Sequence, residues 1–367
     1  MSELRKKLFE GRKPESYARV SENDSTPEVG VGSERDITNR QFKENFYKRR
    51  DALLPIRDRY YLDNYHYVQT YYLPPSSATS PILICHHGAG SSGSTFLAFV
   101  SELLKVCPSD HPGVFLFDMF GHGISTERKS HEYGLEELTA DFSFVLDKFV
   151  QQYRPRQLFF IGHSLGGAIM SNFLVKHEYK CQVTGLVLID IVEETAIRSL
   201  NAMPSFLKSR PKTFQLYDDA LNWHLKTRIL RNEDSAKLSI HDMLQGDDMG
   251  DLHWRTDLER MAPFWKDWFT GMSDHYLLCD SFSDKHIAKL LILAGNENLD
   301  KSLIVGQMQG KYQLIVFNNS DEIGHFVQED SPSKLCISIM EFIRRHDVSS
   351  KERKHSSIRT LWGGEIH

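Results

Sequence analysis

The sequence predicts an α/β fold, a mostly parallel sheet flanked by helices, because buried-strand patterns alternate with helix patterns. Six apolar runs have the length of a strand and no polar alternation, as expected of strands covered on both faces. They are Ile82-Leu83-Ile84-Cys85, Val114-Phe115-Leu116-Phe117, Leu158-Phe159-Phe160-Ile161, Leu186-Val187-Leu188-Ile189, Leu290-Leu291-Ile292-Leu293 and Leu314-Ile315-Val316-Phe317. Helix patterns cover Leu135–Tyr153, Leu165–His177 and Pro332–Arg345. The chain should therefore form one layered domain.

Two additional strands are expected ahead of the first apolar run. Residues 59–73 are rich in Tyr, which favours strands, and contain an Asp-Asn pair typical of a turn. A tight turn joins antiparallel strands, so the sheet should begin with an antiparallel pair.

The interval between Asp190 and Lys289 departs from this alternation. It carries helix-like patterns and several tryptophans, which are Trp223, Trp254, Trp265 and Trp268. We interpret about 191–285 as a helical cap inserted after one strand. Such a cap would cover a site at the carboxyl ends of the strands.

The two ends of the chain differ from the folded domain expected over 51–347. Residues 1–50 are polar and lack a sustained apolar period, which predicts disorder. Residues 348–367 are polar and basic, and we expect a loose tail.

Composition excludes several classes of protein. With 44 basic and 49 acidic residues the net charge is −5, and no basic stripe with aromatics indicates a nucleic-acid partner. No apolar run reaches the length of a membrane span, and the N-terminus lacks a secretory signal. Five scattered cysteines without a Cys-x-x-Cys pair are typical of reduced thiols. We expect a cytoplasmic or nuclear location, with no metal or cofactor.

A nucleophile motif follows one predicted strand and precedes a predicted helix. Gly162-His163-Ser164-Leu165-Gly166 matches G-x-S-x-G, the elbow that exposes a reactive serine on a strained turn in the α/β-hydrolase fold. Small residues at 162 and 166 allow the close approach that this turn needs. The sequence therefore predicts a hydrolase of the α/β-hydrolase fold with Ser164 as nucleophile.

A serine nucleophile needs a base and an orienting acid, which follow it in the order Ser, acid, His in this fold. His325 lies between the last predicted strand and the last predicted helix, where the fold carries its base. Asp190 and Asp300 follow two successive predicted strands. Either strand end could supply the acid, so fold position alone leaves both open.

The loop after the strand Ile82–Cys85 has the composition of an oxyanion loop. His87-Gly88-Ala89-Gly90 contains small residues that let a backbone N–H approach a carbonyl oxygen. We expect the N–H groups of Ala89 and Leu165 to form the oxyanion hole. His87 and His122 are expected to shape loops and not to react.

Three other stretches resemble one family, the protein phosphatase methylesterases. They are Leu188-Ile189-Asp190-Ile191-Val192-Glu193-Glu194-Thr195-Ala196, Arg210-Pro211-Lys212-Thr213-Phe214 and Gly306-Gln307-Met308-Gln309-Gly310-Lys311-Tyr312. The resemblance implies a serine carboxylesterase that demethylates the C-terminal leucine of the type 2A protein phosphatase catalytic subunit. It also places the triad acid at Asp190, which leaves Asp300 as a helix N-cap.

The implied substrate makes a protein partner necessary, because a leucine methyl ester does not distinguish one protein tail from another. Met308 and Gln307 are candidate contacts with the folded phosphatase, since flexible thioethers suit adaptable surfaces. A buried helix methionine is the alternative for Met308. Two other functions compete: a general carboxylesterase, lipase or thioesterase with the same triad, and a phosphatase-binding regulator with little turnover.

Overall fold

A single mixed sheet organises the molecule. The computed structural model describes residues 34–280, 286–295, 298–317 and 322–347. Eight strands lie in the order β1-β2-β4-β3-β5-β6-β10-β11. Their bounds are β1 Ile56–Tyr61, β2 Tyr67–Leu73, β3 Ile82–His86, β4 Gly113–Phe117, β5 Leu158–His163, β6 Val183–Ile189, β10 Ala288–Ala294 and β11 Gln313–Phe317. All six predicted strands are present, and five are buried along their length, whereas β11 lies at the edge of the sheet and is half-buried.

The strand directions also agree with the sequence. β1 and β2 pair antiparallel around the Asp-Asn turn, and β2 pairs antiparallel with β4. The remaining neighbours, from β4 through β3, β5, β6 and β10 to β11, pair parallel. The carboxyl ends of β3, β5, β6, β10 and β11 therefore meet at one edge of the sheet.

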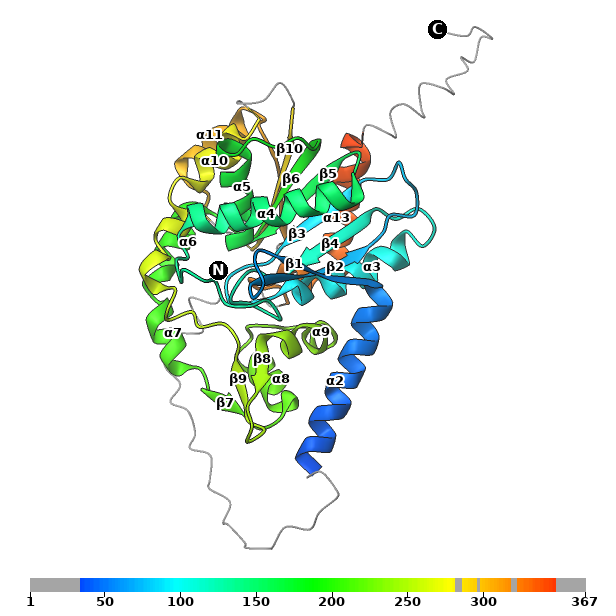
Figure 1. Cartoon of the computed structure of the whole chain (residues 1–367). Helices are drawn as coiled ribbons and strands as arrows, with labels where there is room; N and C mark the ends of the chain where they lie inside the picture. The colour runs from blue at the N-terminus through cyan, green and yellow to red at the C-terminus, as the bar shows by residue number, and fades with distance from the viewer. Residues whose placement is uncertain (1–33, 281–285, 296–297, 318–321, 348–367) are drawn as a thin grey trace, which may run out of the picture.

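Helices cover both faces of the sheet and enclose two separate apolar clusters. α4 (Leu135–Tyr153) and α5 (Leu165–Lys176) pack on one face. α3 (Leu97–Val106) and α13 (Pro332–His346) pack on the other. The strands between them are buried along their length, which explains why their sequences show no alternation (Figure 1).

The segment between β6 and β10 is largely helical, as expected of the cap, but it also contains a small sheet that the sequence analysis did not predict. Its elements are α6 Glu193–Leu200, α7 Met203–Ser209, β7 Thr213–Phe214, α8 Tyr217–Lys226, α9 Glu233–Met243, β8 Leu244–Gly246, β9 Leu252–Trp254, η2 Ala262–Phe264, η3 Asp267–Phe269 and α10 Met272–Leu278. β7, β9 and β8 form a small antiparallel sheet. Its strands have two or three residues each, too few for a sequence period to appear.

The expectation of disorder over residues 1–50 is wrong for residues 34–50, because α2 spans Glu34–Leu53. This helix has few apolar residues, and both polar and aromatic contacts hold it: Arg35 pairs with Asp251, and Asn39 accepts from the Tyr217 N–H at 3.1 Å. Phe46 stacks on His241 of α9 with 4.4 Å between ring centroids, and the buried guanidinium of Arg50 lies 5.2 Å from the ring centroid of Tyr71. Figure 1 shows α2 running beside α9. Tertiary contacts, and not local amphipathicity, explain the helix.

The remaining elements are η1 (Gly93–Phe96), α11 (Lys301–Met308) and α12 (Val327–Asp330). The rest of the predicted N-terminal segment and the predicted tail lie outside the described residues. All five cysteines are free thiols and buried. No helix in the described ranges combines the length and the apolar character needed to cross a bilayer.

Candidate active site

Ser164 occupies a strained turn between β5 and α5, in the strand-turn-helix setting predicted for its motif. Its φ and ψ are 51° and −120°, a conformation that L-residues rarely adopt. The flanking glycines allow the turn: a Cβ at Gly162 would lie 2.4 Å from Gly167 Cα, and one at Gly166 2.4 Å from the His86 carbonyl oxygen. The Ser164 N–H donates to the Ile189 carbonyl at 3.1 Å.

His325 is hydrogen-bonded to Asp190, one of the two carboxylates that the sequence left open. Nδ1 of His325 lies 2.8 Å from Oδ2 of Asp190, and the Ala294 N–H donates to Oδ1 of the same carboxylate at 2.8 Å. Asp190 is 1% exposed and has a φ of 52°. The positive φ turns the chain directly after β6. The carboxylate can accept one hydrogen bond from β10 and another from the histidine.

Asp300 serves a different purpose. Its Oδ1 accepts from the Leu303 N–H at 3.0 Å, which makes it the N-cap of α11, and its Oδ2 accepts from Ser273 Oγ at 2.6 Å. Both oxygens are thus occupied by structural contacts. The structure brings Asp190 to His325 and leaves Asp300 at the helix start.

A contact that the sequence analysis missed holds the main chain of His325. His163 Nε2 lies 2.9 Å from the carbonyl oxygen of His325. Burial lowers the pKa of His163 to about 3, so its imidazole is neutral and donates this hydrogen bond from Nε2. His163 occupies the first variable position of G-x-S-x-G, and the motif gives no signal for this role.

Two buried histidines support the loop opposite the nucleophile, in agreement with the loop-shaping role expected of them. His122 Nε2 accepts from the Gly90 N–H at 3.0 Å, and His87 Nε2 accepts from the Met119 N–H at 2.9 Å. Burial lowers the pKa of both imidazoles, which keeps these nitrogens available as acceptors. Hydrogen bonds to these two buried imidazoles therefore hold the loop in place.

The two backbone groups expected to receive an oxyanion border Ser164. Leu165 is the first residue of α5, so its N–H has no acceptor within the helix. Ala89 follows Gly88, at which an added Cβ would lie 3.0 Å from Ser164 Cβ. Ala89 and Ser164 line the same cavity. The loop thus lies against the serine, as an oxyanion hole requires.

This cavity, of about 160 Å³, combines reactive groups at its base with apolar walls from the cap. Ser164 and His325 both line it, although no hydrogen bond joins their side chains in the described structure. Its aromatic walls are Phe206, Trp223, Trp254, Trp268, Phe269 and Phe326. Such walls suit a small apolar acyl group and exclude much of the water around it.

The residues predicted to contact a protein partner lie on the surface. Met308 is 84% exposed at the end of α11, and Gln307 beside it is also exposed. The exposure of Met308 excludes the alternative of a buried helix methionine. Ile304 and Val305, on the same helix, are 46% and 44% exposed, so α11 presents several apolar side chains to solvent.

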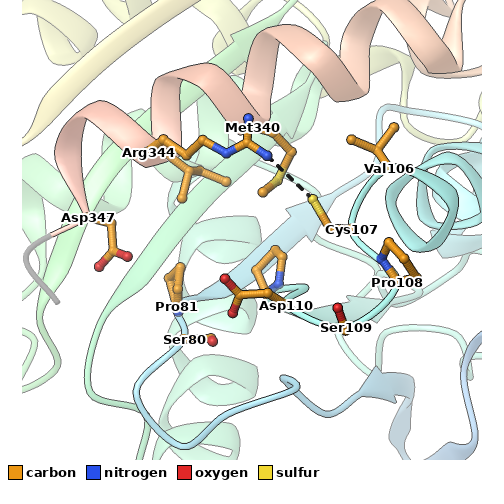
Figure 2. Close-up of a pocket in the computed structure, with 12 residues that line it drawn as sticks. Ser80, Pro81, Val106, Cys107, Pro108, Ser109, Asp110, Met340, Arg344 and Asp347 are labelled. Atoms are coloured by element: carbon orange, nitrogen blue, oxygen red, sulfur yellow. Dashed lines mark hydrogen bonds between the residues drawn. The ribbon is translucent and has the colours of Figure 1, made fainter. Parts of the chain in front are cut away.

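A second cavity, of about 320 Å³, lies at the opposite edge of the sheet. Pro81 and Pro112, which line it, directly precede the amino-terminal ends of β3 and β4. Figure 2 shows Arg344 of α13 reaching toward Cys107, with Nη2 and Sγ 3.7 Å apart. In open α/β sheets ligands bind at the carboxyl ends of the strands, so the cavity at Ser164 is the candidate active site.

Comparison with known proteins identifies the family of the chain. A model of the alpha/beta hydrolase family matches residues 83–338. Protein phosphatase methylesterase 1 of Debaryomyces hansenii is 45% identical over 305 residues, covering 82% of this chain and 77% of the relative. The Saccharomyces cerevisiae protein of the same name is 38% identical over 336 residues, covering 87% and 78%.

Solved structures share the fold at lower identity. The crystal structure of E-2-(acetamidomethylene)succinate hydrolase superposes with a TM-score of 0.61 and 19% identity, covering 78% of this chain and 98% of that one. That likeness confirms the predicted α/β-hydrolase fold. The relatives above share far more of the sequence over most of both chains. The chain belongs to the protein phosphatase methylesterase family and is a carboxylic ester hydrolase.

Proposed function

We propose that this chain removes the methyl ester from the C-terminal leucine of the type 2A protein phosphatase catalytic subunit, with Ser164, His325 and Asp190 as its catalytic residues. The observation that carries the proposal is the hydrogen-bonded His325–Asp190 pair beside a strained Ser164, in a cavity with apolar walls. The name shared by its relatives, protein phosphatase methylesterase 1, supports a phosphatase as the substrate protein.

The first half of the reaction forms an acyl-enzyme. Ser164 Oγ attacks the ester carbonyl while His325 accepts the serine proton. Asp190 holds the imidazole through Nδ1 and stabilises the positive charge that develops on it. The carbonyl oxygen becomes an oxyanion, to which the N–H groups of Ala89 and Leu165 donate. The C–OCH3 bond then breaks, and His325 gives its proton to the departing methoxide, which leaves as methanol.

The second half restores the serine. A water molecule transfers a proton to His325 and its oxygen attacks the acyl carbon, so that the same backbone N–H groups again receive the oxyanion. The bond to Ser164 Oγ breaks, and the proton on His325 returns to the serine. The products are methanol and the free leucine carboxyl group, which releases its proton to solvent as the carboxylate forms, so every atom of ester and water is accounted for.

The walls of the cavity favour leucine as the residue that carries the ester. The side chain of leucine is apolar, and the cap provides aromatic and aliphatic surface around Ser164. Burial of one apolar side chain supplies about 1.5–3 kcal/mol. That energy is too small to select one protein tail among many, so a larger contact with the phosphatase is needed.

We assign this larger contact to α11. A group of exposed apolar side chains can mark a protein-binding surface, and Ile304, Val305 and Met308 all lie on α11. Gln307 adds an exposed amide to the same helix. A partner that covers this surface would bury apolar area outside the catalytic cavity, and the energy gained would be specific to the folded phosphatase.

Incubation with carboxymethylated phosphatase catalytic subunit tests the proposal, with release of the methyl group as the measurement. The wild-type protein should release the methyl group, and the Ser164→Ala variant should not. A fluorophosphonate should label the wild type and leave the variant unlabelled. If small esters or thioesters are hydrolysed and the methylated phosphatase is not, the chain is an esterase of another substrate class. If Ser164→Ala still supports release, the nucleophile is assigned incorrectly.

A further inference from the structure

The segment directly after His325 carries two neighbouring carboxyl groups that the reaction does not use. α12 contains four residues and ends with Glu329 and Asp330. Glu329 is 2% exposed and accepts a hydrogen bond from Ser239 Oγ at 2.6 Å. Asp330 is partly exposed, and its carboxylate accepts hydrogen bonds from backbone N–H groups. The two carboxyls therefore offer a comparison within a single turn of helix.

Asp330 joins the main chain at Gly324, the residue before His325, to the cap. Its Oδ2 accepts from the Gly324 N–H at 2.7 Å, and its Oδ1 accepts from the Arg231 N–H at 2.7 Å. Gly324 immediately precedes His325, while Arg231 lies between α8 and α9. Both hydrogen bonds end on one carboxylate, and bonds of this charge-assisted kind are stronger than those between neutral groups.

Gly324 also lies against the side chain of Arg231. A Cβ added at Gly324 would lie 3.2 Å from Nε, Cζ and Nη2 of Arg231, so the guanidinium would have to shift by a few tenths of an ångström to admit a larger residue. The next carbonyl, that of His325, receives the hydrogen bond from His163. Backbone groups on either side of the His325 side chain are therefore held by different elements, one from the cap and one from the elbow.

We infer that Asp330 is a positioning residue, whose carboxylate holds the main chain at Gly324 next to the cap at Arg231 and thereby keeps the imidazole of the adjoining His325 on Asp190. This inference rests on the proposed role of His325 as the base. Asp330 itself touches neither substrate nor reacting atoms. Its effect on the reaction would be transmitted through the main chain of the base.

Asp330→Asn in the full chain tests the inference, because the side chain keeps its size while one acceptor oxygen becomes a donor. That amide NH2 would face a backbone N–H, so one of the two hydrogen bonds is lost. Misplacement of a catalytic group by about 1 Å can cost 10²-fold in rate. We expect kcat on a small chromogenic ester to fall about 10- to 100-fold. KM should stay near the wild-type value, and fluorophosphonate labelling of Ser164 should slow by a similar factor.

Glu329→Gln is the matched control, since it removes a carboxyl from the neighbouring residue of the same helix without touching Gly324. It should keep the wild-type kcat. Gly324→Ala is the second variant and disturbs the main chain at the same residue by crowding Arg231. It should reproduce the fall in kcat without a change in KM. The folded fraction of each variant is measured by circular dichroism, and each kcat is expressed per folded molecule.

Wild-type kcat in Asp330→Asn would overturn the inference. So would a loss that Glu329→Gln shares, that matches the unfolded fraction, or that falls on KM alone. The Ser164→Ala variant separates this outcome from a failure of the proposed function. If Ser164→Ala is inactive while Asp330→Asn is normal, only the positioning role is wrong. If Ser164→Ala stays active, the proposed triad itself is wrong.

Discussion

Two neighbouring strands of the sheet, β6 and β10, are each followed by an aspartate, yet the two residues have different surroundings. Asp190 comes directly after β6 with a φ of 52° and accepts hydrogen bonds from Ala294 and His325. Asp300 comes six residues after β10 ends at Ala294 and caps α11. In both places an aspartate follows a parallel strand of the same sheet. The path of the backbone after each strand makes the difference.

The same two strand ends differ in what they present to solvent. The chain after β6 turns inward, and Asp190 is almost fully buried. The chain after β10 leads to α11, whose outer side chains include the exposed Met308. Under the proposed function, the first strand end serves proton transfer at His325. The second strand end leads to the surface proposed to bind the phosphatase, so the two have separate expectations.

The largest expected effect separates the two aspartates. Asp190→Asn removes the charge that stabilises the imidazolium, and loss of this acid lowers kcat by about 10⁴-fold in the serine protease precedent. Asp300→Asn keeps an oxygen that can cap α11, so its kcat should stay within about threefold of wild type. Hydrolysis of a small chromogenic ester by both purified variants provides the measurement.

A crippled Asp300→Asn beside an active Asp190→Asn would reverse the roles assigned to β6 and β10. Circular dichroism of both variants is the control, because each aspartate also accepts a structural hydrogen bond. A loss of folded protein would appear there and would not be mistaken for a loss of catalysis.

A smaller effect, limited to the protein substrate, is expected at α11. Met308→Asp places a charge within the exposed apolar side chains of this helix. Loss of a contact worth about 1.4–2 kcal/mol lowers kcat/KM on the methylated phosphatase about 10- to 30-fold. The same variant should hydrolyse a small chromogenic ester at the wild-type rate, because Met308 does not line the cavity at Ser164.

Met249→Asp is a close control for this experiment. Met249 is also 84% exposed, but it lies between β8 and β9, at the end of the molecule away from α11 (Figure 1). It should leave both activities unchanged. Equal losses on both substrates in Met308→Asp would mean that α11 supports the fold or the chemistry, and the docking assignment would be abandoned.

The contrast between β6 and β10 also shows what could be predicted from the sequence. The parallel strands were predictable because strands buried on both faces carry continuous apolar runs. A motif and chain order predicted Ser164 and His325 as site residues, and both line the same cavity. The choice between Asp190 and Asp300 did not follow from the residues alone, because it depends on a backbone angle. The family resemblance supplied the choice.

Other parts of the molecule could not be predicted, because their sequences show no periodic pattern or motif. α2 is held by stacking of Phe46 on His241 and by the buried Arg50, and these contacts form only in the folded chain. The strands of the small cap sheet are too short to show a period. Asp330 belongs to no motif, and its two backbone partners are 6 and 99 residues away in the sequence. Such contacts require the tertiary structure.

The smallest effect on turnover is expected for Glu329→Gln. Unlike the two aspartates, Glu329 should carry a protonated, uncharged carboxyl group in the folded protein. Burial raises the pKa of Glu329 to about 8, although hydrogen bonds from Ser239 and Thr95 lower it. The unfolded chain releases this proton near its ordinary pKa of 4.5, while the folded protein keeps it up to about pH 8. Between these values the folded state binds more protons, so the free energy of unfolding decreases as pH rises.

Glu329→Gln should remove this pH dependence, because the amide stays neutral in both states and can still bond to the hydroxyls of Ser239 and Thr95. Urea unfolding of both proteins at pH 5 and at pH 8 tests this expectation. The quantity compared is the free energy of unfolding of the variant minus that of wild type. This difference should be larger at pH 8 than at pH 5 by a few kcal/mol, since each pKa unit corresponds to about 1.4 kcal/mol. A difference that stays constant with pH would mean that Glu329 is ionised in the folded protein. The buried carboxyl beside Asp330 would then be charged like Asp190, and its use as a neutral control would be invalid.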